Sequence, residues 1–354
     1  MTLFDKLEIP IVQAPMLGAS TPEMALVVSR AGGLGSLAAA GLAPDALETA
    51  AAQLRAATDR PFALNLFITQ PAHPSAAEVE QAQEVLRPWY GARGLELPDP
   101  PNDFAQDYER QFAALVRAAP PAASFTFGIL TADQVGALRA QGTAVIGTAT
   151  TVAEARAWEA VGADVICAQG FEAGGHRGSF LGAQEDNLVG TLALVSTIRR
   201  AVRAPVIAAG GIMDGRGVAA ALALGAAAAQ MGTAFLLADQ TMVSKPWRRS
   251  IETAGDDPTR LTRAFSGRYA RGVENDFMRK MRPLEQAVPA YPVQNRLTQP
   301  LRAAATAQDD ADAISMWAGQ AVNLAGPGDA GALVERWWAE AKDTAWDLVK
   351  RTGG

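Results

Sequence analysis

The chain has 354 residues, of which 49% are hydrophobic and 19% charged, and its formal net charge is −6. This length fits a β/α barrel of about 250 residues that carries insertions. The acidic balance, without runs of Lys and Arg interleaved with aromatic residues, argues against nucleic acid as a partner.

The few cysteines and histidines limit the kinds of site that the chain can build. The single cysteine, Cys167, excludes an internal disulfide and a multi-cysteine zinc site, and two separated histidines give no typical metal-ligand spacing. Cys167 stands in an apolar run and is interpreted as a buried strand thiol rather than a nucleophile. No window of about 18 uncharged apolar residues and no signal peptide is found, so we expect a cytoplasmic protein with no membrane partner.

Short apolar runs recur along the chain, each followed by a turn and an Ala/Leu-rich helical pattern. They predict eight strands, at 11–14, 34–37, 62–67, 124–127, 143–147, 164–168, 205–209 and 227–231. Helix start signals separate them, for example at Thr131 and Asp214. Apolar strands alternating with helices predict an α/β fold with a parallel sheet, and eight such units close a (β/α)8 TIM barrel. An open doubly wound sheet is the alternative.

Two stretches interrupt this alternation. Residues 68–123 are too long for a βα loop and contain helical patterns near 76–89 and 103–118, so we predict a helical insertion over the top of the barrel. Residues 242–311 are predicted to form a lid on the substrate side. Residues 312–354, whose last helical pattern contains Trp337, Trp338 and Trp346, are predicted to be C-terminal helices that return to the barrel formed by residues 1–241.

The loops after the strands are where the active site of such a barrel lies. Gly210 and Gly211 follow the seventh predicted strand, and Gly232 and Thr233 follow the eighth. These two loops are the usual phosphate site of the fold, because glycines let backbone amides close on an anion. A phosphorylated cofactor or substrate is therefore expected. The turn Gln13-Ala-Pro-Met16 could approach a flat heterocycle, although such a turn is often only structural.

The segment 169–178, Gln-Gly-Phe-Glu-Ala-Gly-Gly-His-Arg-Gly, follows the sixth predicted strand. Glycines flank His176 and would be costly in a regular element, so we expect a loop that brings the imidazole close to a ligand. Histidine is the side chain best suited to proton transfer near neutral pH. The alternative is a surface histidine that caps a turn, and His73 is expected to be solvated and inert.

Asn65 is a polar residue in an otherwise apolar predicted strand. If it is buried, its amide needs hydrogen-bond partners. Either the pyrimidine edge of a flavin or a backbone group could supply them.

Several of these motifs together resemble one family. They are Gln13-Ala-Pro-Met16, Asn65-Leu-Phe67, the segment 169–178, Ala208-Ala-Gly-Gly-Ile212 and Gln230-Met-Gly-Thr233. In this order they resemble the nitronate monooxygenases, formerly called 2-nitropropane dioxygenases. The element Glu-Ala-Gly-Gly-His-Arg-Gly is the specific part of the likeness.

The resemblance implies non-covalent FMN and oxidation of alkyl nitronates, such as propionate 3-nitronate, by dioxygen to a carbonyl compound and nitrite. It implies His176 as the catalytic base and a role in detoxification. We expect the cofactor to be bound by Ala14, Met16, Asn65, Gln169, Gly174, Gly175, Gly210, Gly211, Gln230, Gly232 and Thr233. The segment 290–298 resembles the lid of the family, which would place Tyr291 or Arg296 near the substrate. Packing for the tyrosine and a surface ion pair for the arginine are the alternatives.

Two other classes of function remain open from the sequence. An FMN-dependent NAD(P)H reductase, acting on an enoyl thioester or a quinone, would use a similar barrel. A non-catalytic flavin or phosphate carrier, or a dehydrogenase of the inosine-phosphate type, would share the phosphate loops, but the dehydrogenase needs a loop cysteine as nucleophile. The chain is expected to be a monomer or a homodimer, and neutral nitroalkanes are possible substrates beside nitronates.

Overall fold

The computed structural model describes residues 3–101 and 103–352, so the outermost residues of the predicted segments and residue 102 lie outside it. Its main sheet contains eight parallel strands: β1 (Ile11–Gln13), β2 (Gly35–Ala38), β3 (Phe62–Phe67), β4 (Ala122–Thr126), β5 (Ala144–Ala149), β6 (Val165–Gln169), β8 (Val206–Ala209) and β9 (Ala228–Met231). Their order is β1-β9-β8-β6-β5-β4-β3-β2. A bridge between Val12 and Leu34 joins the two ends. The predicted TIM barrel is confirmed.

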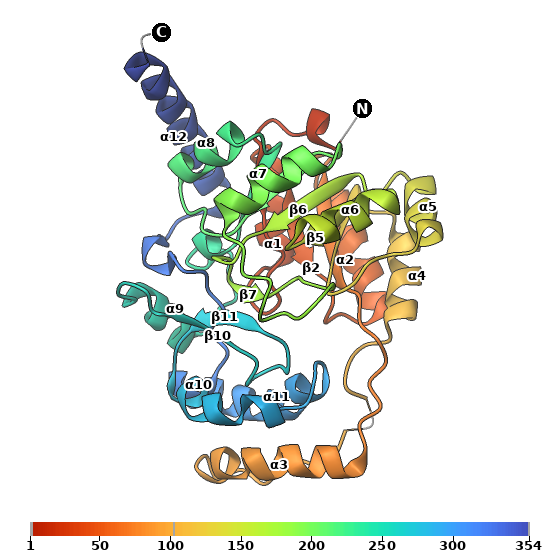
Figure 1. Ribbon diagram of the computed structural model, residues 1–354, viewed down its shortest axis with the longest axis vertical. Coiled ribbons are helices and arrows are strands. Elements are labelled where there is room, and N and C mark those ends of the chain that lie inside the picture. The colour runs from red at the N-terminus through yellow and green to blue at the C-terminus, as the bar shows by residue number, and fades with distance from the viewer. Residues whose placement is uncertain (1–2, 102, 353–354) are drawn as a thin grey trace.

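Helices surround this barrel (Figure 1). They are α1 (Pro22–Arg30), α2 (Pro44–Ala57), α4 (Tyr108–Ala118), α5 (Ala132–Ala140), α6 (Val152–Ala160), α7 (Thr191–Ala201), α8 (Gly215–Ala223) and α12 (Ala330–Arg351). The predicted start signals at Thr131 and Asp214 cap α5 and α8. α12 packs against α8 and α1, so the last helix of the chain closes the ring that the first one opens.

The side chains of each strand alternate between the helices and the barrel interior. One apolar cluster contains the inward residues near the amino ends of the strands, with Leu3 beside them; it includes Val12, Ala63, Ile146, Val165, Cys167 and Ile207. The next inward positions toward the carboxyl ends carry Ala14, Asn65, Thr126, Thr148, Gln169 and Gln230. The interior therefore changes from apolar to polar toward the end of the barrel where a TIM-barrel active site is expected.

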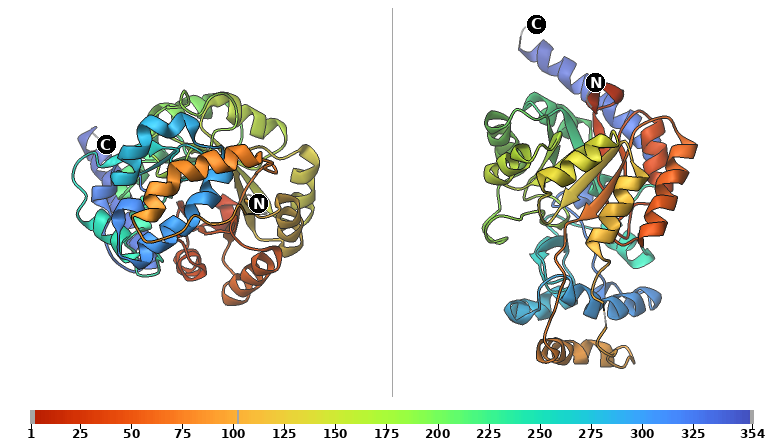
Figure 2. Two further views of the ribbon diagram at one scale, coloured as in Figure 1. Left: turned by 90° about the horizontal axis from the view of Figure 1, so that it is seen from below. Right: turned by 90° about the vertical axis from the view of Figure 1, so that its right-hand side faces the viewer.

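A second layer of structure, which we call the lid, covers the carboxyl ends of the strands (Figure 1). It contains α3 (Ala76–Gly91), α9 (Lys245–Glu252), β10 (Thr259–Thr262), β11 (Ala270–Val273), α10 (Asp276–Met281) and α11 (Val293–Ala307). Figure 2 shows α3 crossing the outer side of the lid helices. There it packs on α11, and the Tyr90 hydroxyl donates a hydrogen bond to Leu297 O at 2.7 Å.

The lid has an apolar core of its own, in which Phe265 and Phe277 stack with ring centroids 4.5 Å apart. Short 3-10 helices complete the chain: η1 (Phe4–Lys6), η2 (Thr233–Phe235), η3 (Arg282–Ala287), η4 (Ala311–Ala313) and η5 (Val322–Leu324). The helix expected at 103–118 begins only at Tyr108, where Asp107 caps it. This helix packs against α2 of the barrel, whereas α3 lies in the lid. The predicted division into 1–241, 242–311 and 312–354 stays a prediction.

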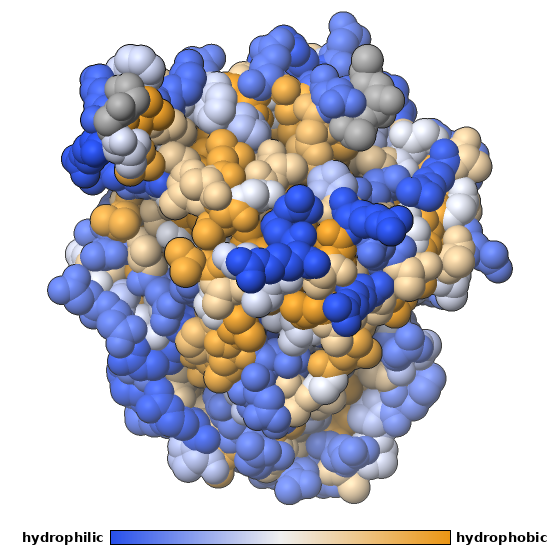
Figure 3. Space-filling model, turned by 45° about the horizontal axis from the view of Figure 1, so that its top comes forward, coloured by the Kyte–Doolittle hydropathy of each residue, from blue (hydrophilic) through white to orange (hydrophobic). Residues whose placement is uncertain are grey.

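The face seen in Figure 3 mixes apolar and hydrophilic residues. At the end of α12, Trp346, Leu348 and Val349 are exposed, while Trp337 is buried against the barrel. Within the described residues, no helix combines the length and the apolar character needed to cross a membrane. The choice between a monomer and a homodimer stays a prediction.

Candidate active site

A cavity of about 350 Å³ lies between the carboxyl ends of the barrel strands and the lid. Its volume is in the usual range for a small-molecule pocket, about 300–1,000 Å³. All twelve residues predicted for the site line it: Ala14, Met16, Asn65, Gln169, Gly174, Gly175, His176, Gly210, Gly211, Gln230, Gly232 and Thr233. The fold therefore brings together residues that are up to 219 positions apart in the sequence.

Two loops on the barrel side present backbone amides without acceptors. Within the described chain, no amide of residues 210–213, after β8, donates a hydrogen bond, and the same holds for residues 232–234, after β9. Such runs of free N–H groups form a site for an anion. The predicted phosphate loops thus have the donors that a phosphate needs.

Gly210 is a position where the backbone requires glycine. Its φ is +114°, and a Cβ there would lie 2.8 Å from Thr191 Oγ1. Thr191 Oγ1 lies 2.9 Å from Gly210 O and 2.8 Å from a carboxylate oxygen of Glu172, so its one proton can be donated to either acceptor. Glu172 also accepts the first amide of α7, from Thr191 at 2.9 Å. Glu172 therefore fastens the loop after β6 to the loop after β8.

Two other polar residues of the segment 169–178 hold the backbone around His176. The Gln169 side chain donates to His176 O at 3.0 Å and accepts from Gly178 N at 2.8 Å. Arg177 is fully buried and donates to Gly170 O at 2.7 Å and to Asn187 O at 2.9 Å. Gln169 thus lines the cavity as predicted, but its amide is engaged within the protein. Its part in cofactor binding stays a prediction.

The predicted loop conformation of His176 is wrong, because Gly175–His176 forms the short strand β7. β7 pairs antiparallel with β11, where His176 is opposite Ala270 and Gly175 opposite Arg271. Its partner strand lies more than 90 residues further along the chain, and two residues are too few to show a strand pattern in the sequence. This pairing attaches the catalytic candidate to the lid as well as to the barrel.

Gly174 allows the lid connection to approach this strand closely. A Cβ at Gly174 would lie 2.6 Å from the backbone of Ala318 and Gly319. Gly319 N in turn donates to Thr233 Oγ1 at 2.9 Å. The chain before α12 is thereby held against both the histidine segment and the loop after β9.

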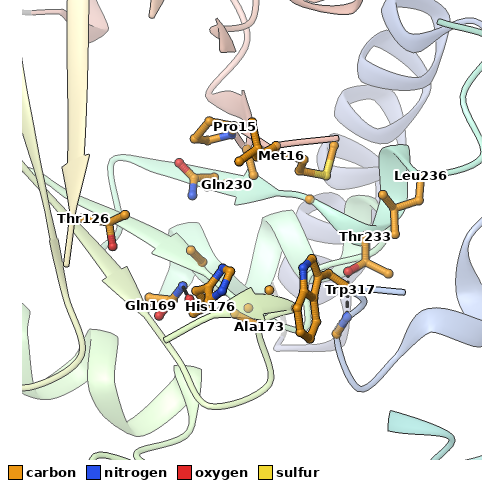
Figure 4. Close-up of a pocket in the computed structure, with 18 of the residues that line it drawn as sticks. Pro15, Met16, Thr126, Gln169, Ala173, His176, Gln230, Thr233, Leu236 and Trp317 are labelled. Carbon is orange, nitrogen blue, oxygen red and sulfur yellow. Dashed lines mark hydrogen bonds between the residues drawn. The ribbon is translucent and has the colours of Figure 1, made fainter. Parts of the chain in front are cut away.

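His176 projects into the cavity from the side of β6, together with Trp317, while Pro15, Met16 and Gln230 lie opposite (Figure 4). Aromatic rings surround the imidazole, with ring centroids 5.4 Å away for Phe127 and Trp317 and 5.9 Å for Tyr291. Phe127, the residue after β4, has a φ of +76°, which is strained for a bulky side chain. The chain thus holds this ring beside the imidazole at a conformational cost.

A hydrogen bond to Ser266 assigns the tautomer of His176. His176 Nε2 lies 2.9 Å from Ser266 Oγ, and the Ser266 hydroxyl donates to Arg268 O at 3.0 Å. Because a hydroxyl has one proton, Ser266 must accept from the imidazole, and we assign the proton of the neutral ring to Nε2. Nδ1 has no hydrogen-bond partner among the described residues and carries the free lone pair.

The surroundings keep this imidazole neutral. Burial, with the positive charges of Arg268 and Arg302, lowers the pKa of His176 to about 3. Because a histidine is protonated only below its pKa, the ring is an unprotonated base throughout the neutral range. Burial likewise raises the pKa of Tyr291 to about 12, so the phenol beside it keeps its proton.

Tyr291 and Arg296, the two residues that the segment 290–298 suggested as substrate neighbours, lie in different environments. Tyr291 packs against His176, Phe67 and Phe127. Arg296 is exposed and donates to Gln299 Oε1, so the prediction that placed it near the substrate is not supported. Arg302, six residues further along α11, lines the cavity instead. Arg296 and Arg302 are both polar positions on one helix, and the sequence alone does not show which of them faces inward.

The remaining single-residue predictions are resolved by their surroundings. Asn65 is buried, and its amide donates to Ser124 O at 3.1 Å and to Ser124 Oγ at 3.0 Å. A backbone group therefore supplies one of the hydrogen-bond partners that the buried amide requires. Cys167 is a free, buried thiol in β6, and burial raises its pKa to about 12, as expected for a structural cysteine. His73 is exposed. Among the described residues, no group of His, Cys, Asp or Glu is arranged to hold a metal ion.

Comparison with known sequences identifies the family of this chain. A family model described as nitronate monooxygenase matches residues 1–340. A probable nitronate monooxygenase of Staphylococcus saprophyticus is 40% identical over 328 residues, which cover 92% of each chain. One from Staphylococcus aureus strain Newman is 40% identical over 326 residues, again 92% of each chain. The chain belongs to the nitronate monooxygenase family.

Solved structures agree with this membership. The nitroalkane oxidase from Streptomyces ansochromogenes superimposes with a TM-score of 0.91 at 42% identity, over 98% of this chain and 99% of that one. FabK from Thermotoga maritima follows with a TM-score of 0.77 at 31% identity, over 99% and 98% of the two chains. The nitronate monooxygenase family is one of oxidoreductases, and this chain is accordingly an enzyme of that class.

Proposed function

We propose that this member of the nitronate monooxygenase family uses non-covalently bound FMN to oxidise alkyl nitronates, such as propionate 3-nitronate, with dioxygen. Two nitronates and one dioxygen give two carbonyl compounds and two nitrite ions. The observation that carries the proposal is the combination in one cavity of a neutral histidine and two runs of free backbone amides. His176 acts as the base when the substrate arrives as a neutral nitroalkane.

The residues of the cavity fit FMN. The free amides of residues 210–213 and 232–234 match a phosphate, and the positive φ of Gly210, which requires glycine in the first loop, supports the same assignment. Gln230 makes no side-chain hydrogen bond within the described chain and faces the cavity, so its amide is available to the edge of a flavin (Figure 4). Asn65 and the turn at Ala14 and Met16 would complete the contacts to the ring system.

Bound FMN supplies one-electron oxidation of the nitronate and transfer of that electron to dioxygen. The protein's part is acid-base and electrostatic. Neutral His176 removes a proton from the carbon that bears the nitro group, with Nδ1 as the basic atom. Arg268, whose charge helps to lower the pKa of the imidazole, stabilises the negative charge of the nitronate for the same electrostatic reason.

The competing functions have less support. An NAD(P)H reductase remains the second candidate because the barrel is shared: the enoyl reductase domain of MlnA from Bacillus amyloliquefaciens matches with a TM-score of 0.58 at 12% identity, which shows the fold alone. A dehydrogenase of the inosine-phosphate type would need a reactive cysteine, whereas the thiol of Cys167 is buried in a strand and protonated at neutral pH.

Oxygen uptake and nitrite release by FMN-loaded protein test the proposal. We expect rapid uptake with propionate 3-nitronate and none with NADH or NADPH. His176→Asn should lower turnover of neutral 3-nitropropionate by about 10²- to 10⁴-fold, the usual contribution of a general base, and affect the preformed nitronate far less. His73→Asn, at the exposed histidine, is the matched control.

Two results would overturn the assignment. Anaerobic bleaching of the flavin by NADH or NADPH, without oxygen uptake on nitronates, would make the protein a reductase. A yellow protein that reacts with none of these compounds would make it a carrier. Equal losses for nitroalkane and nitronate in His176→Asn would leave the activity standing but remove His176 as the base.

A further inference from the structure

Arg302 is an unpaired cation in the wall of the active-site cavity. It lies on α11 and lines the cavity with Asn295, Ser315 and Trp317. Its Nη2 donates to Asn295 O at 2.8 Å and to Asn295 Oδ1 at 2.9 Å, and its Nη1 makes only a 3.5 Å contact with Ser315 Oγ. Nε is buried and has no hydrogen-bond partner in the described part of the chain. Throughout the described residues, no carboxylate forms an ion pair with it.

Such an arrangement is costly for the protein alone. Buried charges are normally paired, because removing an ion from water costs several kcal/mol. Burial lowers the pKa of Arg302 only to about 10, so the group remains a cation at neutral pH. An anion that enters the cavity would supply the missing partner.

The position of Arg302 points to the substrate rather than to the cofactor phosphate. The free amides that suit a phosphate belong to the loops after β8 and β9 in the barrel, whereas Arg302 belongs to the lid. Its electrostatic influence reaches His176 and Tyr291, which face each other at 5.9 Å between ring centroids. Arg302 is therefore near the base but on a different element.

We propose that Arg302 binds a carboxylate at the end of the substrate opposite the nitronate, and so makes the enzyme selective for nitronates that carry a second acidic group. This inference rests on the proposed nitronate oxidation. The guanidinium offers Nη1, whose contact with Ser315 Oγ is long at 3.5 Å, for a charge-assisted hydrogen bond to this carboxylate. Alkyl nitronates without a carboxylate would leave this cation unpaired and bind more weakly.

Paired substrates and paired variants test the proposal. Propionate 3-nitronate carries the carboxylate, and propyl-1-nitronate has the same chain length without it. Arg302→Met should raise KM for propionate 3-nitronate about 10- to 100-fold, the range for a lost hydrogen bond to a charged group, and leave propyl-1-nitronate nearly unchanged. Arg302→Lys should give an intermediate loss. Arg296→Met, at the exposed arginine of the same helix, is the matched control and should behave as wild type.

Calorimetric binding of succinate provides a readout without turnover, because succinate has the shape of propionate 3-nitronate with a carboxylate in place of the nitronate group. Arg302→Met should weaken the binding of succinate to FMN-loaded protein about 10-fold or more, whereas Arg296→Met should leave it unchanged. Wild type that oxidises neither nitronate but binds succinate through Arg302 would refute the proposed function and keep this site.

Three outcomes would overturn the proposal itself. Equal losses with both nitronates in Arg302→Met would assign the guanidinium to the nitronate group. Loss of FMN from this variant, with an unchanged melting temperature, would assign it to the cofactor. Wild-type succinate affinity in both Arg302→Met and Arg302→Lys would show that the site binds no carboxylate. If Arg302→Met does not fold, the lysine variant decides between these results.

Discussion

The barrel side and the lid side of the cavity present different chemical groups to it. The barrel contributes backbone amides and small side chains at the ends of its strands, as in the loops after β8 and β9. The lid contributes large side chains, among them Trp317, Tyr291 and Arg302. Backbone amides form an anion site that does not depend on side-chain identity, whereas side chains on a separate layer can change without altering the barrel.

His176 is joined to both sides of the cavity. Gln169 in the barrel holds its carbonyl group, while Ser266 in the lid accepts from its imidazole. The strand pair β7 and β11 connects the two layers at this residue. Changes on the barrel side should therefore affect the cofactor, and changes on the lid side should affect catalysis and selectivity.

The largest expected effect of a barrel-side change is on cofactor affinity. In Gly210→Ala, the new Cβ would lie 2.8 Å from Thr191 Oγ1, and alanine is strained at a φ of +114°. Relief of this strain would displace the free amides of the loop, and the loss of one hydrogen bond to a charged phosphate, about 1.5–3 kcal/mol, corresponds to a loss of FMN affinity of about 10- to 100-fold, measured by fluorescence titration of the apoprotein. KM for propionate 3-nitronate in FMN-saturated protein should change little.

Gly225→Ala is the matched control, because Gly225 also has a positive φ, +90°, but lies in the exposed turn after α8. It should lower the melting temperature and leave FMN affinity unaltered. If both variants bound FMN as wild type does, the loop after β8 would not be a phosphate site, and the contrast between the two sides of the cavity would fail.

A lid-side change at Ser266 should act on the chemical step instead. In Ser266→Ala, Nε2–H of His176 loses its acceptor and the tautomer is no longer fixed, so kcat for neutral 3-nitropropionate should fall about 10-fold. Turnover of the preformed nitronate and FMN affinity should be nearly unchanged. Ser196→Ala, whose hydroxyl bonds only to Leu192 O on α7, is the control.

The pH dependence of kcat/KM tests whether His176 is the unprotonated base. Burial, Arg268 and Arg302 hold the pKa of His176 at about 3, so the base is lost only as the pH falls toward that value. For the neutral substrate, kcat/KM should show no histidine ionisation between about pH 5 and pH 8 in wild type or in Ser266→Ala. An inflection of kcat/KM near pH 6.5 in wild type would contradict the lowered pKa of His176. Higher activity of Ser266→Ala than of wild type on the neutral substrate would make Nε2, not Nδ1, the basic atom.

The barrel side could be predicted from the sequence because its signals are local. Each strand is a short apolar run with a turn after it, and all eight lie within a few residues of their predicted positions. Gly210 and Gly232 stand directly after strands, so the topology of a barrel brings them together without knowledge of the lid. The same locality predicted that Cys167 would be buried.

The lid side could not be predicted in the same way because its contacts are long-range. Ser266 lies 90 residues from His176, and neither Ser266 nor Trp317 belongs to a motif that signals proximity to an imidazole. Arg302 was missed in favour of Arg296, since the inward face of α11 is set by its packing on α3 and the lid core. Gln169 lines the cavity as predicted, but the sequence does not show that its amide also holds the backbone of its own segment.

The smallest expected effect comes from a substitution remote from the cavity, which serves as a reference for the other variants. Gly136 is an exposed residue inside α5, and a Cβ there would meet no heavy atom within 4 Å. Gly136→Ala should therefore raise the free energy of unfolding by about 0.5–1 kcal/mol, the gain of alanine over glycine in a helix, measured by urea denaturation. FMN affinity and KM for both nitronates should remain those of wild type. A change in either ligand parameter would mean that a stability change alone alters the cavity, and the losses expected from Gly210→Ala and Ser266→Ala would then no longer report on local contacts.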